Sequence, residues 1–122
     1  MGERLEVAKE VLERAKEEYK RGKALKENLF IRNACDKAFL AVVQAVNDLV
    51  KEKTGVVPTD HRMRRDFLRE MGREDLRAEY SDIMRDLHDD CFYSGIIIEK
   101  NIEKAVQKVE EFLKKIEEAE KS

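Results

Sequence analysis

The sequence predicts an all-α protein, an up-and-down bundle of four to five helices that forms a single domain over residues 1–122. Charged residues make up 43% of the chain, which has only one proline and five glycines. That balance favours long helices with solvated faces over a β-sandwich, which would need many turns. Hydrophobic residues make up 42% and recur at helical spacing, which excludes disorder. The chain is long enough to bury a core without disulfides or a structural metal.

The first two helices differ in how much of their surface is apolar. Apolar residues of the N-terminal segment recur at alternating three- and four-residue steps, at Leu5, Ala8, Leu12, Ala15 and Tyr19. This pattern is typical of an amphipathic helix with one narrow apolar stripe, for which Gly22 is a candidate stop or C-cap. The second helix, over residues 24–53, is apolar on more than one face between Ala38 and Val50. We therefore expect it at the centre of the bundle or at a subunit interface.

Residues 54–60 are predicted to form a loop that leads into a short third helix. Gly55 can adopt the positive φ that ends a helix, and Pro58 cannot continue one. The threonine and the aspartate at the end of the loop are both able to cap the next helix. That helix is expected over residues 61–71, and Gly72 ends it.

Two further helices complete the predicted bundle. The fourth begins near Arg73, and its apolar seam consists of Leu76, Tyr80, Ile83, Leu87, Cys91 and Ser94. Gly95 either interrupts this helix or lies within it. The last segment, residues 96–119, places Ile98, Ile102, Ala105, Val109, Phe112 and Ile116 on one face.

The sequence also predicts the cellular setting. Cys35 and Cys91 lie at apolar helix positions, too far apart in sequence for a CxxC motif, and are expected to be two reduced core thiols of a cytoplasmic protein. We find no signal peptide and no apolar run near the ~20 residues that a membrane span needs, so no membrane association is expected. The net charge of −2 does not by itself favour nucleic acid as a partner. Abundant Lys and Glu with few Gln and Asn suggest a thermophilic source.

Arg85 and His88 are the candidate catalytic residues. They are three residues apart, so in an α-helix they project from one face. An imidazole transfers protons near neutral pH, and a guanidinium binds phosphate and stabilises developing charge. The pair therefore suits phosphodiester cleavage. The alternative is that Arg85 pairs with a neighbouring aspartate while His88 packs at the edge of the seam.

Four aspartates surround this pair at helical spacing, namely Asp82, Asp86, Asp89 and Asp90. Carboxylates on one face could hold a hard cation. Metal sites in helical bundles usually draw ligands from several helices, however, and di-iron bundles use a Glu-x-x-His motif that this chain lacks. We favour ion pairs between these aspartates and nearby arginines, and expect neither a metal nor a cofactor.

A basic segment precedes the candidate pair and is the best case for nucleic-acid binding. Six arginines and no lysine lie between His61 and Arg77, namely Arg62, Arg64, Arg65, Arg69, Arg73 and Arg77. Arginine in place of lysine indicates directed contacts. Four carboxylates in the same segment reduce its net charge to +2. His61 is expected to be structural or on the surface, and Tyr80, Phe92 and Tyr93 to be core or interface aromatics rather than a base-stacking platform.

Three parts of the chain together resemble the HEPN family of small helical bundles. They are the alanine-rich run from Ile31 to Val46, the Gly55…Pro58…His61 loop, and Tyr80…Leu87-His88…Phe92-Tyr93 ahead of the closing helix. The stretch from Leu87 to Gly95 looks like the archaeal repeat-associated branch of this group. The resemblance covers about residues 3 to 118.

The resemblance implies a homodimer and a link to RNA. Many members of the family are RNases or toxins, often paired with a small nucleotidyltransferase protein, and others bind nucleotides or RNA without cleaving. Catalytic members carry an Arg and a His with four to six residues between them, and both groups gather at the dimer interface. Here only two residues separate Arg85 from His88, and Arg77 lies too far upstream to restore the spacing.

Three functional hypotheses follow for the chain. The first is a non-catalytic or diverged HEPN-like accessory module of a toxin–antitoxin or defence system that associates with nucleic acid or a nucleotide. The second is a metal-independent RNase that uses His88 as acid and base and Arg85 as phosphate clamp. The third is a purely structural homodimer.

Overall fold

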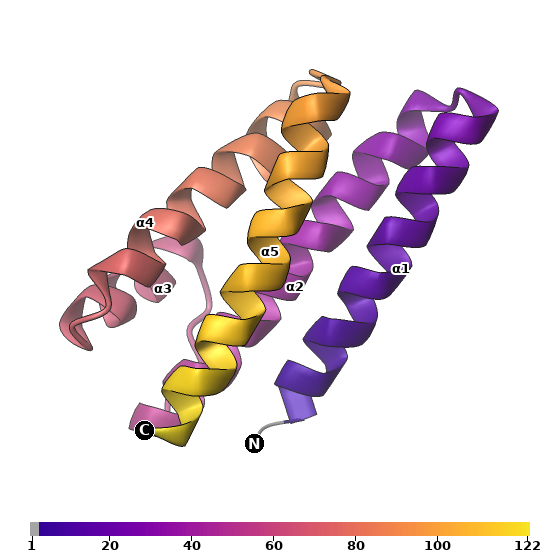
Figure 1. Ribbon diagram of the computed structural model, residues 1–122. Coiled ribbons are helices and arrows are strands. Elements are labelled where there is room, and N and C mark those ends of the chain that lie inside the picture. The colour runs from indigo at the N-terminus through magenta and orange to yellow at the C-terminus, as the bar shows by residue number, and fades with distance from the viewer. Residues whose placement is uncertain (1–2) are drawn as a thin grey trace.

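The computed structural model describes residues 3–122 and contains helices only, with no strand among these residues (Figure 1). The elements are α1 (Glu3–Leu25), α2 (Asn28–Thr54), α3 (His61–Glu70), α4 (Glu74–Ile83), the π-helix η1 (Met84–Tyr93) and α5 (Glu99–Lys121). The predicted all-α bundle is thus confirmed, with η1 continuing the path of α4.

The long elements run up and down beside one another (Figure 1). α2 packs against α1, α5 and η1, so it is the central helix of the bundle. Along it, neighbouring residues are completely buried in pairs, namely Ala41 and Val42, Ala45 and Val46, and Leu49 and Val50. Two adjacent faces of α2 therefore lie in the core, as its wide apolar stripe predicts.

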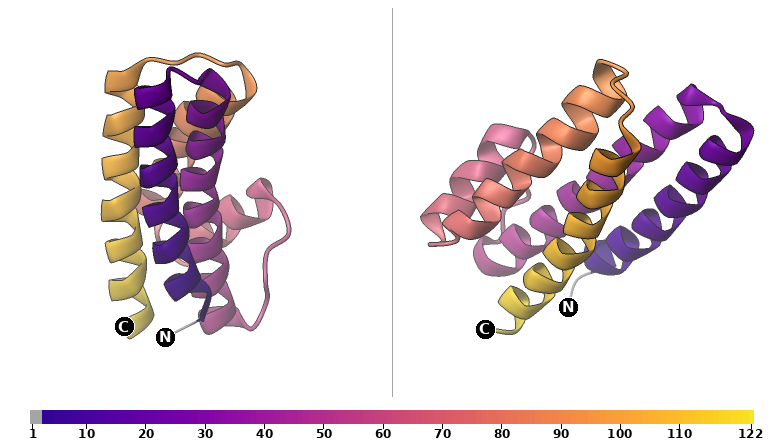
Figure 2. Two further views of the ribbon diagram at one scale, coloured as in Figure 1. Left: turned by 90° about the vertical axis from the view of Figure 1, so that its right-hand side faces the viewer. Right: turned by 45° about the horizontal axis from the view of Figure 1, so that its top comes forward.

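The predicted boundaries around the α2–α3 loop are confirmed. Gly55 has φ 80°, and its N–H donates to the carbonyl of Lys51 at 2.8 Å. A residue with a Cβ would be strained in this left-handed backbone conformation, which glycine adopts freely. Asp60 caps α3 by accepting a hydrogen bond from the Met63 N–H at 2.8 Å. The connection between them runs outside the three long helices (Figure 2).

Two details of the predicted helices are wrong. Gly22 does not end α1, which continues to Leu25. A Cβ at Gly22 would lie 2.9 Å from Cγ1 of Ile31, so this glycine allows α1 and α2 to approach closely. Ile98, expected on the buried face of the last helix, is exposed in the link before α5.

The cysteines are buried as expected, but the prediction of two reduced thiols is wrong. Cys35 of α2 and Cys91 of η1 form a disulfide, with a Cα–Cα distance of 6.3 Å. That separation lies within the range that a disulfide spans. The packing of η1 on α2 brings together two residues that are 56 positions apart in sequence.

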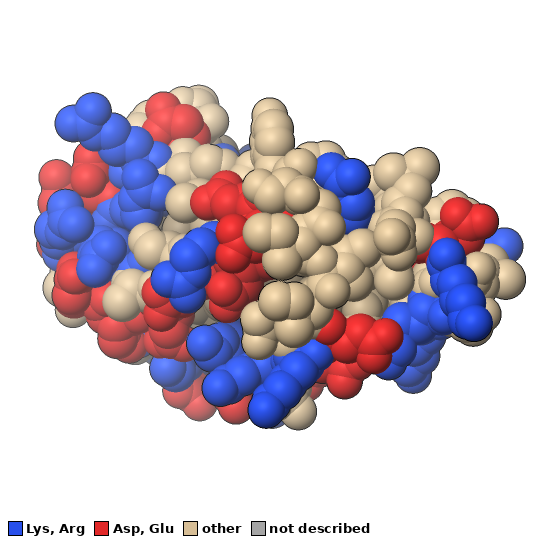
Figure 3. All heavy atoms as spheres, turned by 90° about the horizontal axis from the view of Figure 1, so that it is seen from above, with Lys and Arg blue, Asp and Glu red and all other residues tan. Residues whose placement is uncertain are grey.

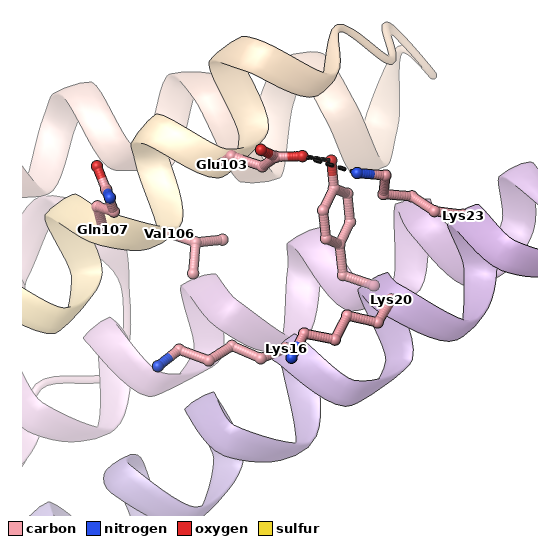
Figure 4. A pocket seen from close by; sticks show the side chains of 7 residues that line it. Lys16, Lys20, Lys23, Glu103, Val106 and Gln107 are labelled. Atoms are coloured by element: carbon pink, nitrogen blue, oxygen red, sulfur yellow. Dashed lines mark hydrogen bonds and ion pairs between the residues drawn. The ribbon is translucent and has the colours of Figure 1, made fainter.

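A ladder of ion pairs links α1 to α5. Lysines at seven-residue steps in α1 meet glutamates at seven-residue steps in α5, in antiparallel order: Lys9 with Glu117, Lys16 with Glu110, and Lys23 with Glu103. A groove of about 470 Å³ lies between these helices, and Lys23 and Glu103 meet at its edge (Figure 4). The ladder thus matches the register in which α1 lies against α5.

None of the helices described over residues 3–122 combines the length and apolar character needed to cross a bilayer.

Candidate functional site

The two histidines of the chain lie next to each other in the folded protein. His61 begins α3 and His88 lies in η1, yet their ring centres are 5.7 Å apart. Phe39 of α2 contacts both rings, at 5.5 Å from His61 and 5.4 Å from His88. Three separate elements therefore build a compact aromatic cluster around a pair of imidazoles.

Asp36 orients His88. The Nδ1 atom of His88 lies 2.9 Å from Oδ1 of Asp36 on α2. An ionised carboxylate can only accept, so Nδ1 donates to it and the neutral ring keeps its lone pair on Nε2. Phe92 stacks nearly parallel to the imidazole at 6.0 Å. This arrangement leaves Nε2 as the atom that can accept a proton.

His61 is held in the opposite tautomer. Its Nδ1 lies 2.8 Å from the Tyr80 hydroxyl and 3.2 Å from Nη1 of Arg64. A guanidinium can only donate, so Nδ1 accepts and the proton of the neutral ring resides on Nε2. Burial lowers the pKa of His61, and the charges of Arg64, His88 and Arg65 lower it further. The neutral imidazole is therefore favoured, and its Nε2–H is a hydrogen-bond donor.

Arg64 and Tyr80 support His61 from inside the protein. The Arg64 residue is only 7% exposed, and its Nε donates to Oδ1 of Asn47 at 2.9 Å. Its Nη1 also reaches the Tyr80 hydroxyl at 3.4 Å. Tyr80 is fully buried, and burial raises the pKa of its hydroxyl although Arg64 opposes the shift. Over residues 3–122, no ion pair is found for Arg64, so its charge is held by neutral groups.

A surface pocket of about 560 Å³ lies at this cluster. Its lining consists of Glu18, Asn33, Asp36, Lys37, Leu40, Val43, His61 and Phe92. His88 borders the pocket, because it contacts three of the lining side chains. Neither Nε2 atom has a hydrogen-bond partner within the described residues 3–122, so both remain available to a bound molecule.

The candidate pair of Arg85 and His88 has separate partners. Arg85 is 61% exposed at its side chain and pairs with Asp82 and Asp86, while His88 bonds to Asp36. In η1 the hydrogen bonds run from residue i to i+5, as from the Ser94 N–H to the Asp89 carbonyl. Each turn therefore takes more residues than in an α-helix, and a step of three no longer returns to the same face.

The six arginines do not gather into one basic patch. Arg64 is buried beside His61, and Arg65 contacts the Met84 sulfur. The other four each pair with a nearby carboxylate: Arg62 with Asp66, Arg69 with Asp66 and Glu74, Arg73 with Asp75, and Arg77 with Glu74. Their partners lie within the same segment rather than in η1.

No group of three or more His, Cys, Asp or Glu side chains placed to hold a metal ion is found in the described part of the chain.

Sequence reasoning missed His61, Arg64 and Asp36 as parts of one site. Asp36 has a detectable signal, because it is a charged residue beside the buried run of α2. Arg64 has none, because in the sequence it is one of six similar arginines. Tyr93 also differs from a core aromatic: it is 72% exposed, with its ring edge-on to His88 at 5.6 Å.

Tyr93 belongs to a wider apolar area at one end of the bundle. Uncharged side chains there form a continuous surface between charged ones (Figure 3). The exposed large hydrophobic residues of the α1–α2 turn and the η1–α5 link are Leu25, Leu29, Phe30, Tyr93, Ile96 and Ile98. Arg32 fixes the end of η1 by donating to the carbonyl oxygens of Phe92, at 2.7 and 2.9 Å, and Tyr93, at 3.0 Å.

Comparisons with known proteins identify a family and no characterised relative. Neither the search of curated proteins nor the search of solved structures yields a match. A family model described as a domain of unknown function, DUF5618, matches residues 2–118, which is nearly the whole chain. The protein therefore belongs to the DUF5618 family.

Proposed function

We propose that this protein is a metal-independent ribonuclease in which His88 is the general base and His61 is a neutral hydrogen-bond donor. The observation that supports it is the pairing of the two imidazoles beside a pocket, each with Nδ1 held by the protein and Nε2 without a partner among residues 3–122. A base within reach of a donor is the arrangement that acid–base catalysis requires.

The reaction that suits this pair is transfer of an RNA phosphodiester to its own 2′-hydroxyl. Nε2 of His88 takes the proton of the 2′-hydroxyl, the 2′-oxygen attacks the neighbouring phosphorus, and the bond to the 5′-oxygen breaks. The proton on His88 then returns to the leaving 5′-oxygen, directly or through water. This route needs a 2′-hydroxyl as nucleophile, so the substrate is RNA and not DNA.

In this proposal the other groups have separate roles. Asp36 holds His88 in the tautomer that leaves Nε2 basic and stabilises the imidazolium that forms. The Nε2–H of His61 donates to a non-bridging phosphate oxygen, where negative charge accumulates. Burial and the charge of Arg64 together favour neutral His61, and Arg64 holds it in that tautomer.

A second candidate is a non-catalytic module that associates with nucleic acid or a nucleotide in a toxin–antitoxin or defence setting. The separation of Arg85 from His88 favours it, because catalytic HEPN members use an Arg–His pair. In this second proposal the protein is related to the HEPN family, forms a homodimer and acts with a small nucleotidyltransferase protein. The apolar end of the bundle is a surface on which such a protein contact could form.

Cleavage assays with EDTA separate the two candidates. Purified protein is incubated with single-stranded RNA and tRNA beside His88→Ala, His61→Ala and Asp36→Asn variants of matched thermal stability. The ribonuclease proposal predicts cleavage by the wild type and a loss of about 10²–10⁴-fold in His88→Ala. Equal activity in wild type and His88→Ala contradicts it. A wild type that binds RNA without cleaving it supports the second candidate.

A further inference from the structure

We propose that the disulfide between Cys35 and Cys91 positions Asp36 against His88, so that the thiol–disulfide state of the protein controls this site. The inference concerns regulation of the site and, as far as activity is concerned, rests on the proposed ribonuclease function. Its structural part, the coupling of the disulfide to the hydrogen bond, is testable without any activity.

The disulfide and the hydrogen bond between His88 and Asp36 both join α2 to η1, at neighbouring positions. Cys35 directly precedes Asp36 on α2, and Cys91 lies three residues after His88 in η1. The disulfide holds the two Cα atoms of the cysteines 6.3 Å apart, and the hydrogen bond beside it joins Nδ1 of His88 to Oδ1 of Asp36 at 2.9 Å. Separating α2 from η1 at the cysteines would therefore also separate the imidazole from the carboxylate.

The burial of these residues indicates which bond depends on the other. The side chains of His88 and Asp36 are 24% and 41% exposed, and a partly exposed hydrogen bond contributes little to holding two helices together. The cysteines are at most 1% exposed, within the core. The covalent link therefore constrains the two helices, and the hydrogen bond forms within that constraint.

Reduction of the disulfide has a defined chemistry. A thiolate of a dithiol attacks one sulfur and forms a mixed disulfide, and the second thiol of the reductant then displaces the remaining protein sulfur. Two electrons and two protons pass to Cys35 and Cys91, and the reductant becomes a cyclic disulfide. Because both sulfurs are buried, the attack requires η1 to move away from α2, and we expect it to be slow.

The first part of the test establishes the bond and its effect on His88. The protein is denatured and alkylated with and without prior dithiothreitol, and its mass is measured by mass spectrometry to count the free thiols. Nitrogen-15 NMR then reports the tautomers of both imidazoles in the folded protein, which has only two histidines. In the oxidised protein we expect His88 to carry its proton on Nδ1. After dithiothreitol we expect that preference to be lost, while His61, which bonds to Tyr80 and Arg64, keeps its own.

The second part measures activity and includes a control for stability. RNA cleavage should fall by about 10- to 100-fold on reduction, because catalysis is sensitive to displacements of about 1 Å. The double variant Cys35→Ala, Cys91→Ala should behave as the reduced wild type in both readouts and no longer respond to dithiothreitol. Val109→Ala, which removes buried volume from α5, should lower the melting temperature without changing the His88 tautomer.

Two results would overturn the proposal: free thiols in the protein purified without reductant, or a His88 tautomer that is the same in oxidised and reduced protein. A protein that is inert on RNA but whose His88 signal changes on reduction supports the coupling and contradicts only the ribonuclease function.

Discussion

Nη1 of Arg64 lies 3.2 Å from Nδ1 of His61, so a buried guanidinium donates to the imidazole instead of to a carboxylate. This contact gives His61 a different chemical character from His88, whose Nδ1 faces the carboxylate of Asp36. The same side-chain type therefore leaves an N–H on Nε2 in one position and an unprotonated Nε2 in the other, and the difference comes from the neighbours.

Replacement of Arg64 should raise the pKa of His61. In Arg64→Met the positive charge beside Nδ1 is lost, whereas the burial that contributes most to lowering the pKa of His61 remains. We therefore expect the pKa of His61 to return part of the way toward the ordinary histidine value of 6.5, as measured by NMR titration of the two histidines. Arg62→Met is the control, because Arg62 is exposed and pairs with Asp66. An unchanged pKa in Arg64→Met would show that Arg64 does not control His61.

Arg85 should matter far less than His88. Its guanidinium is exposed and already paired with two aspartates, so Arg85→Ala should change RNA cleavage by less than about tenfold. His88→Ala should lose about 10²–10⁴-fold. Initial rates of RNA cleavage by the two variants, measured under identical conditions, test this difference. Equal large losses in both variants would restore Arg85 as the phosphate clamp.

Glu120 should make the protein less stable at alkaline pH. Burial and the neighbouring carboxyl of Asp48 raise the pKa of Glu120 from 4.5 to about 8. Since the folded state binds this proton more tightly than the unfolded chain, the stabilisation is fully present below pH 4.5 and is lost as the pH rises through about 8. The melting temperature of the wild type should therefore fall as the pH is raised from 6 to 9.

A neutral amide at this position should remove that dependence. Buried oxygens of Asp48 and Glu120 have no hydrogen-bond partner among residues 3–122, which fits a proton shared between the two carboxyls. At pH 9 the free energy of unfolding of Glu120→Gln should exceed that of the wild type by about 1–2 kcal/mol. The gain is smaller than full burial would give, because water screens the half-buried Glu120. The exposed Glu118→Gln is the control, and a parallel pH response in all three proteins would refute the shared proton.

The ladder between α1 and α5 should contribute more to register than to stability. Each rung is partly exposed, and such pairs are worth about 0.2–1 kcal/mol. Lys16→Glu should therefore destabilise the protein only modestly, and the swap with Glu110→Lys should recover most of the loss. By contrast, Leu12→Ala, in the core beneath the ladder, should cost about 2–5 kcal/mol. Urea denaturation of a double-mutant cycle measures these energies, and a coupling well above 1 kcal/mol would contradict the prediction.

Tyr93 offers a direct probe of RNA binding. It is exposed and edge-on to His88, where a base of a single strand could stack on it. The chain has no tryptophan, so Tyr93→Trp introduces a single tryptophan, whose fluorescence is excited selectively at long wavelength. We expect single-stranded RNA to quench its fluorescence, and Tyr93→Ala to weaken binding by about tenfold. Binding that is unaffected in Tyr93→Ala would assign the residue to a protein contact instead.

Most of the fold could be predicted from local patterns. The apolar spacing of α1, α2 and α5 specifies which face of each helix is buried, because a helical period of 3.6 residues places such positions in one stripe. Gly55 and Asp60 specify where α2 ends and α3 begins, because their roles depend on backbone geometry within a few residues. The role of Gly22 does not follow from local pattern, because it depends on Ile31 of another helix.

By itself, therefore, the sequence determined the helices and the wide apolar stripe of α2, and it singled out the segment around His88 as a candidate site. Only the tertiary structure decided that His61 joins His88, that Asp36 and Arg64 give the two rings opposite tautomers, and that Cys35 meets Cys91. The physical reason is that helix formation depends on neighbours within about one or two turns, whereas a site made of α2, α3 and η1 depends on how those elements pack. The change from α4 to the π-helix η1 adds a second reason, because it turns His88 away from the face that α-helical spacing assigns to it.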